Sequence, residues 1–243
     1  MPEMIKESFL KSQINKAKKE RKTPSFVKRL VLLSLDDALA AHYSNERSMK
    51  CLQSSLALVA LLEKFNIKAT IWSGAVCVSK IPDNSAFPAS WNGFWGDDHH
   101  VFCCTEFGEL IDLTISYLHE HPNSKHQKQL PVPAIWWEDI ESWPCIIRYL
   151  PEGPVKVLLP EVDMIDLELF KSEALANLQN LISTMAVQNV KYGPILTGKN
   201  SLNILTNEGN QWLNKSLIFQ HQNIPFPEWV SNKESELMRE HAK

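Results

Sequence analysis

Long apolar runs and glycine-rich loops are both missing from this chain of 243 residues. No segment approaches the roughly 18 consecutive apolar residues that a membrane-spanning helix needs, so the sequence predicts no such helix. The N-terminal residues lack the apolar core and cleavage site of a signal peptide, and we therefore expect a cytoplasmic protein. Only eight glycines are present. The stretch YGPILTGKN lacks the spacing and the Gly-Lys-Ser/Thr order of a phosphate-binding loop, which argues against a nucleotide site of that kind.

The five cysteines form no recognisable framework. They are odd in number and irregularly spaced, so free thiols in a reducing compartment are the simplest interpretation. Cys103 and Cys104, with the histidines near them, raise the question of zinc. Adjacent strand residues point to opposite faces, however, and no Cys-x-x-Cys or His-x-x-x-His pair occurs. We expect neither a metal nor a cofactor.

Charge is unevenly distributed along the sequence. The net charge is −3, but residues 1–30 carry nine Lys/Arg and three Asp/Glu, which leaves the rest of the chain strongly acidic. A basic arm over residues 1–22 either touches an acidic surface or forms a solvated helix face. Neither a nucleic acid nor a membrane is an expected partner.

The pattern of apolar residues predicts an α+β fold. Residues 51–65 (CLQSSLALVALLEKF) are apolar almost all round, which is typical of a helix buried inside a domain. Further helices are expected over 26–41, 163–187 and 206–217 and after Pro227, and strands over 67–78, 100–105, 109–115, 145–150 and 155–159. Residues 81–96 are expected to form a loop and residues 117–144 an irregular segment. The predicted architecture is a basic arm (1–22), a core in which the buried helix packs on an antiparallel sheet (23–160), and a helical C-terminal extension packed on that core (161–243).

Cys51 opens the buried helix, which is a favourable position for a nucleophile. Unpaired N–H groups and the positive end of the helix dipole favour thiolate over thiol there. The backbone N–H groups of Cys51 and Leu52 could also hold an oxyanion. A thiol needs a base, and an imidazole needs a carboxylate to fix its tautomer. His100 and Asp112 follow in chain order and supply both.

The stretch from residue 100 to residue 115 predicts a β-hairpin. A turn centred near residue 106 would pair position 100 with position 112, so that His100 and Asp112 could hydrogen-bond across the strands. His99 is the rival base, because only one of two adjacent strand residues can face the helix. Asp112 has an alternative role as a buried cap.

Part of the chain is similar to a known superfamily. The stretch Cys51–Leu58 (CLQSSLAL), followed by Asn66–Ile67 and Gly74–Val76, resembles the cysteine segment of the transglutaminase-like superfamily, which has a papain-like fold. The nearest branch contains the leader-peptide-cleaving proteins of lasso-peptide biosynthesis. His100–Phe102 resembles the His-Ala-Trp strand of that branch, and Asp112 its acidic residue. The resemblance covers about residues 45–115 and implies Cys51 as nucleophile, His100 as base and Asp112 as the residue that orients it. Asn66 stands where the family usually has Gly.

These observations predict a cysteine-dependent hydrolase that acts on an amide bond through a thioester intermediate. The substrate would be a peptide, a protein or a small amide. Trp91, Trp95 and His99 would line its groove, although packing under long loops accounts for the two tryptophans equally well. Two alternatives remain open: an acyltransferase or transglutaminase that uses an amine acceptor, and a non-catalytic binding module with the same fold.

Overall fold

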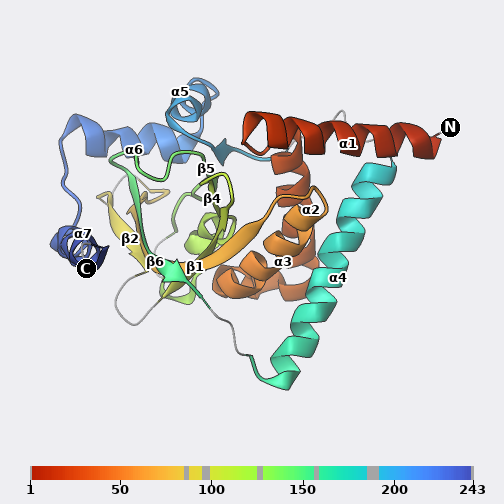
Figure 1. Cartoon of the computed structure of the whole chain (residues 1–243). Coiled ribbons are helices and arrows are strands. Elements are labelled where there is room, and N and C mark those ends of the chain that lie inside the picture. Colours follow the sequence, from red (N-terminus) through yellow and green to blue (C-terminus); the bar gives the residue numbers. More distant parts are fainter. Residues whose placement is uncertain are drawn as a thin grey trace.

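The computed structural model describes residues 2–84, 88–94, 99–124, 128–155, 159–184 and 192–241. Helices lie at both ends of the chain and the strands lie between them (Figure 1). In chain order the elements are α1 (Pro2–Glu20), α2 (Ser25–Tyr43), η1 (Ser44–Met49), α3 (Cys51–Glu63), β1 (Ala69–Lys80), β2 (Ser90–Phe94), β3 (His100–Thr105), β4 (Leu110–Asp112), η2 (Thr114–Glu120), η3 (Pro122–Ser124), β5 (Ala134–Trp137), β6 (Ile147–Pro154), α4 (Glu161–Ser183), β7 (Ile195–Leu196), α5 (Lys199–Asn207), α6 (Gln211–His221) and α7 (Glu228–His241), where η denotes a 3-10 helix.

One sheet contains all of these strands, and the fold class is mixed α+β, as predicted. The strand order is β2-β1-β3-β4-β5-β7, and β6 pairs with β1 outside this path. The long strand β1 pairs with β3 through its first half, with β2 through its second half, and with β6 across the middle. Every pairing is antiparallel except that of β5 with β7. The sheet therefore curls around β1, which is its longest strand.

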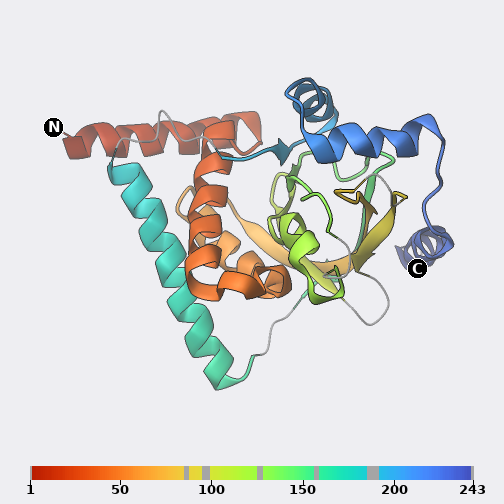
Figure 2. The same cartoon turned by 180° about the vertical axis from the view of Figure 1, so that it is seen from behind.

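Two hydrophobic clusters lie on the two faces of the sheet. Successive side chains of a strand point to opposite faces of the sheet, so neighbouring residues pack in different clusters. In β5, Trp136 packs with the helices α2, α3 and α4, whereas Trp137 packs on the other face with Trp212 of α6. Figures 1 and 2 show α2, α3 and α4 on one side of the sheet and α7 on the opposite side.

Helix α3 has the central position that its apolar sequence predicts. It contacts α2, α4, β1 and β3, and its side chains Leu58, Leu61 and Leu62 are buried. Asn66 has a φ of 54° and ends this segment in the left-handed conformation, as expected for a residue that follows a helix. Because α3 starts at Cys51, its packing fixes that cysteine against the sheet.

The terminal segments contribute to the core. In α1, Ala17 is buried, and the ring of Phe9 lies 5.0 Å from that of Phe26 at 89°. At the other end, β7 adds a strand to the sheet and α6 supplies Trp212 to its second core. The segment 161–243 is thus built into the sheet as well as packed on it. No helix among the described residues is long and apolar enough to cross a membrane.

Several predicted boundaries differ from the structure. The strand expected at 145–150 is β6, which continues through Pro151–Pro154, where a turn was expected, with a shift of register opposite Ser73 and Gly74. Of the strand expected at 155–159, Val155 and Leu159 lie in no strand, and residues 156–158 lie outside the described part. Strand β2 lies inside the expected loop 81–96, and β5 lies inside the irregular segment 117–144. The helix expected near 206–217 is two helices, α5 and α6, separated by a turn at Gly209, whose φ is 82°.

The hairpin forms, but the predicted register is wrong by two residues. Cys103 pairs with Ile111 and Cys104 with Leu110, so position 112 falls opposite 102 and not opposite 100. The turn is centred one residue later than predicted, because Gly108 adopts a φ of 78° and donates its N–H to the carbonyl of Thr105 (3.0 Å). The strand also ends at Asp112, where the chain turns into the 3-10 helix η2.

Candidate active site

Cys51 is the first residue of α3 and is partly exposed. The helical hydrogen bonds begin with Ser54, whose N–H donates to the carbonyl of Lys50 (2.9 Å), so the N–H groups of Cys51 and Leu52 precede them. The thiol is hydrogen-bonded to the side chain of His100 and to the backbone N–H of Val101. The sulfur therefore lies between the helix and the first residues of β3.

His100 is the first residue of β3 and is 2% exposed. Its Nε2 donates to Oδ2 of Asp112 at 2.5 Å, which leaves Nδ1 as the ring nitrogen that can take the proton of Cys51. The ring of Phe94 stacks on the imidazole, with centroids 4.7 Å apart and planes 7° apart. The imidazole is thus held from three sides in one orientation.

Asp112 ends β4 and accepts four hydrogen bonds. Its Oδ2 accepts from His100 and from the hydroxyl of Tyr149 (2.7 Å). Its Oδ1 accepts from the hydroxyl of Thr114 (2.9 Å) and the N–H of Ile115 (3.1 Å). The two roles considered for Asp112 therefore coexist, because one oxygen caps the 3-10 helix η2 and the other oxygen bonds the imidazole.

Burial and charge pull the pKa values of these groups in opposite directions. Burial raises the pKa of the Cys51 thiol, but the hydrogen bond and charge of His100 more than offset this, so that the pKa lies below its usual value. Burial lowers the pKa of His100, but Asp112 and the thiol raise it to about 10. Burial raises the pKa of Asp112, and His100 brings it below the ordinary range. Together these shifts favour a thiolate–imidazolium pair at neutral pH.

A small pocket opens over this pair. Its volume is about 180 Å³. Cys51, the buried His100 and the half-exposed Met49 line it. The other lining residues are Ser48, Phe94, His99 and His121.

The predicted substrate-contacting residues occupy different places. His99 lines the pocket, and its Nδ1 lies 3.5 Å from a carboxylate oxygen of Glu152. The histidine that bonds the cysteine is His100. Trp91 does not line this pocket; it packs on Phe219 and Phe226 and donates to the carbonyl of Pro225 (3.0 Å). Trp95 lies outside the described residues.

Two important residues of the site were not predicted. Tyr149 lies in a strand that the sequence does predict, but nothing in the sequence indicates its bond to a carboxylate 37 positions away. Phe94 belongs to the same aromatic stretch as Trp91 and Trp95 and was considered with them for the substrate groove, but its stacking on His100 was not predicted.

The described residues contain no group of three or more His, Cys, Asp or Glu side chains placed to hold a metal ion. Cys103 and Cys104 pack in different hydrophobic clusters, on opposite faces of the sheet. No protein-family model, curated protein or solved structure matches this chain. The chemistry must therefore be argued from the geometry of Cys51, His100 and Asp112.

Proposed function

We propose that the protein is a cysteine-dependent hydrolase that cleaves an amide bond. Cys51 is the nucleophile, His100 the general base and Asp112 the residue that orients the base. One observation carries the proposal: the buried imidazole of His100 bonds Asp112 through one ring nitrogen and the thiol of Cys51 on its other side. An inert core cysteine needs neither partner.

The proposed reaction follows from these contacts. The proton of Cys51 passes to Nδ1 of His100, and the thiolate attacks the carbonyl carbon of the substrate. The N–H groups of Cys51 and Leu52, at the start of α3, stabilise the oxyanion. The imidazolium then protonates the leaving amine, which breaks the C–N bond and leaves a thioester. Water, deprotonated by His100, attacks the thioester, and the carboxylic acid leaves as Cys51 regains its proton.

The arrangement of elements supports a transglutaminase-like or papain-like fold. In the resemblance described above, a helix that begins with cysteine precedes antiparallel strands that carry the histidine and the acidic residue. Here α3 packs on β1 and β3, His100 opens β3 and Asp112 ends β4. The same order of elements favours membership of that superfamily.

The size of the pocket favours a peptide over a free small amide. Sites that enclose a whole small molecule usually measure about 300 Å³ or more, and the pocket over Cys51 measures about 180 Å³. Such a pocket accommodates one side chain or the end of one, and the rest of the substrate lies on the surface outside it. We therefore place a peptide or an exposed segment of a protein at this site.

Selective alkylation tests the catalytic pair directly. Limiting iodoacetamide at about pH 6, well below the ~8.5 of an ordinary thiol, is expected to label Cys51 far faster than Cys145, which is the exposed cysteine of the chain. The variant His100→Ala should lose this preference, and the matched variant His99→Ala should keep it. Equal labelling of Cys51 and Cys145 in the unmodified protein would overturn the proposal.

Product analysis completes the test. Incubation with a peptide library, with and without a primary amine, is expected to give free carboxyl termini in both cases. Amide products that form only with the amine would indicate acyl transfer instead. Labelled Cys51 with no turnover of any peptide would leave a reactive thiol without the proposed amide hydrolysis, and would count against it.

A further inference from the structure

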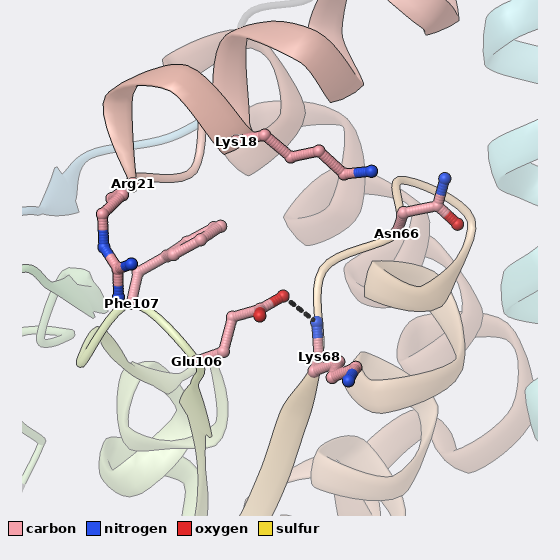
Figure 3. A pocket seen from close by; sticks show the side chains of 6 residues that line it. All are labelled: Lys18, Arg21, Asn66, Lys68, Glu106 and Phe107. Atoms are coloured by element: carbon pink, nitrogen blue, oxygen red, sulfur yellow. Dashed lines mark hydrogen bonds between the residues drawn. The ribbon is translucent and has the colours of Figure 1, made fainter.

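A second cavity lies away from Cys51, between three segments that are distant in the sequence. Its volume is about 540 Å³, within the range of small-molecule sites. In Figure 3, Lys18 and Arg21 approach from the end of α1, Asn66 and Lys68 from the link between α3 and β1, and Glu106 and Phe107 from the turn between β3 and β4. The cavity therefore exists only when these three segments are folded together.

Three of the six lining side chains are cations. Within the described part of the chain, the side chains of Lys18, Arg21 and Lys68 make no ion pair and no hydrogen bond. The neighbouring Lys22 and Lys28, in contrast, are both paired with Glu138. Three unpaired positive charges around one hollow repel one another, and an anion in the hollow relieves that repulsion.

The one carboxylate at this cavity is already engaged. Oε1 of Glu106 accepts the backbone N–H of Lys68 at 2.9 Å, which ties the turn to the start of β1. With Glu106 counted, the lining still carries two net positive charges. Phe107 adds an apolar wall.

Helix-end electrostatics do not account for the whole arrangement. Basic residues in the last turn of a helix interact favourably with the negative end of its dipole, and Lys18 stabilises α1 in this way. Lys68, however, belongs to the link before β1, and Arg21 follows the helix in the left-handed conformation (φ 49°). The presence of all three around one hollow needs a further reason.

We propose that this cavity binds a small molecule that carries a phosphate group. The planar fork of an arginine matches phosphate oxygens, and two lysines supply the remaining charge. A nucleic acid is disfavoured, because the chain outside its first 30 residues is strongly acidic and would repel a long polyanion. The hollow is of a size for a compact ligand.

The cavity and the catalytic pocket lie at opposite ends of the same elements. Helix α3 begins at Cys51 and has 13 residues, which span about 20 Å at ~1.5 Å per residue. The cavity lies beyond its far end, at Asn66, and at the turn opposite the end of β3 that carries His100. A ligand here leaves Cys51 accessible, so the site is independent of the proposed hydrolase activity.

Isothermal titration calorimetry tests the site. Inorganic pyrophosphate is added to the full chain at low ionic strength, and its affinity is measured. The double variant Lys18→Gln/Arg21→Gln is expected to bind at least about tenfold more weakly. The double variant Lys16→Gln/Lys19→Gln removes two charges from the same helix outside the cavity, and should change affinity by less than about twofold. The variant Glu106→Gln keeps the acceptor for the N–H of Lys68 but removes the negative charge, and should tighten binding by about threefold.

Four outcomes would overturn the proposal. Pyrophosphate fails to bind, the two double variants weaken binding equally, Glu106→Gln weakens it, or citrate binds more tightly than pyrophosphate. The second outcome would mean a general charge effect of α1, and the fourth a carboxylate ligand. Alkylation of Cys51 is expected to be unchanged in all of these variants, so failure of this site and failure of the catalytic pair are distinguishable.

Discussion

Tyr149 donates its hydroxyl to Oδ2 of Asp112 at 2.7 Å, the same oxygen that accepts Nε2–H of His100. Both Tyr149 and Asp112 are about 2% exposed. Burial and the neighbouring carboxylate raise the pKa of Tyr149 well above its ordinary value, so its hydroxyl remains a donor. The strand β6 therefore takes part in the site through one hydrogen bond to a charged group.

Removal of this hydrogen bond should destabilise the fold. Tyr149→Phe is expected to lower the free energy of unfolding by about 2 kcal/mol, because a buried carboxylate loses one of its donors. Chemical denaturation at neutral pH measures the change. Tyr43→Phe is the matched control: it removes a tyrosine–carboxylate bond to Asp166 (2.8 Å), where the carboxylate is half exposed, and should cost less than about 1 kcal/mol. Equal costs would contradict the importance of the buried partner.

Asp112→Asn separates charge from geometry. The asparagine oxygen can still accept from His100, but the negative charge that raises the pKa of His100 is lost. With a less basic imidazole the pKa of Cys51 rises, because the hydrogen bond and the charge of protonated His100 are the main causes that lower it. Alkylation of Cys51 at about pH 6 should slow by at least about tenfold. A pH profile of the alkylation rate checks this, and an unchanged profile would show that the ion pair does not form.

The sequence predicts those parts of the fold that have a strong apolar period. Helices α2, α3 and α4 and strands β1 and β3 follow from such patterns, and the structure confirms them within a few residues. Strand β2 was missed, since it is five residues long and contains Asn92 and Gly93. Gly93 is required there: a Cβ atom would lie 2.0 Å from the carbonyl oxygen of Val76, and its φ is 142°. The pattern of apolar residues in a sequence does not indicate where two backbones approach each other closely.

The sequence predicted the juxtaposition of His100 and Asp112 but not the register that brings it about. His100 and Asp112 were expected to face each other directly, whereas the hairpin register places Asp112 opposite position 102. Positions 100 and 102 share one face of β3, so the bond still forms, along the diagonal. The bonds from Tyr149 and Thr114 depend on where the chain turns after Asp112, which is decided by packing and not by local sequence.

A buried ion pair holds the hairpin to α2. Lys28 is 2% exposed, and its Nζ lies 2.6 Å from Glu138 and 3.3 Å from Glu109. Glu109 directly precedes β4 and also accepts from the N–H (3.0 Å) and the hydroxyl (2.5 Å) of Thr23. Through Glu109, the start of α2 is linked to the strand that carries Asp112.

Lys28→Met should therefore be costly. It leaves the carboxylate of Glu109 buried without its cation, and we expect a loss of about 3–5 kcal/mol in the free energy of unfolding. The control Lys22→Met removes the exposed partner of Glu138 and should cost no more than about 1 kcal/mol. The double variant Lys28→Met/Glu109→Gln should recover part of the loss. No recovery would mean that the packing of the lysine stem, and not its charge, carries the effect.

Asp36, on α2, is a partly buried carboxylate whose charge is poorly compensated. Its Oδ1 has no hydrogen-bond partner in the described structure. Burial raises the pKa of Asp36 to about 6, and the nearby Arg47 only partly offsets this. The folded state therefore binds a proton that the unfolded chain, with a pKa near 3.8, has released. Between these two values, the stability of the fold falls as pH rises.

Asp36→Asn removes this titration. At about pH 7.5 the variant should be more stable than the original protein by about 1 kcal/mol, a figure reduced from the full pKa shift because the side chain is partly solvated. Below about pH 4 the advantage should vanish, because the carboxyl group is then protonated in both the folded and the unfolded states. Urea denaturation at the two pH values measures the difference. A stability difference that does not change with pH would show that Asp36 ionises normally in the fold, and that its unpaired oxygen is compensated by solvent.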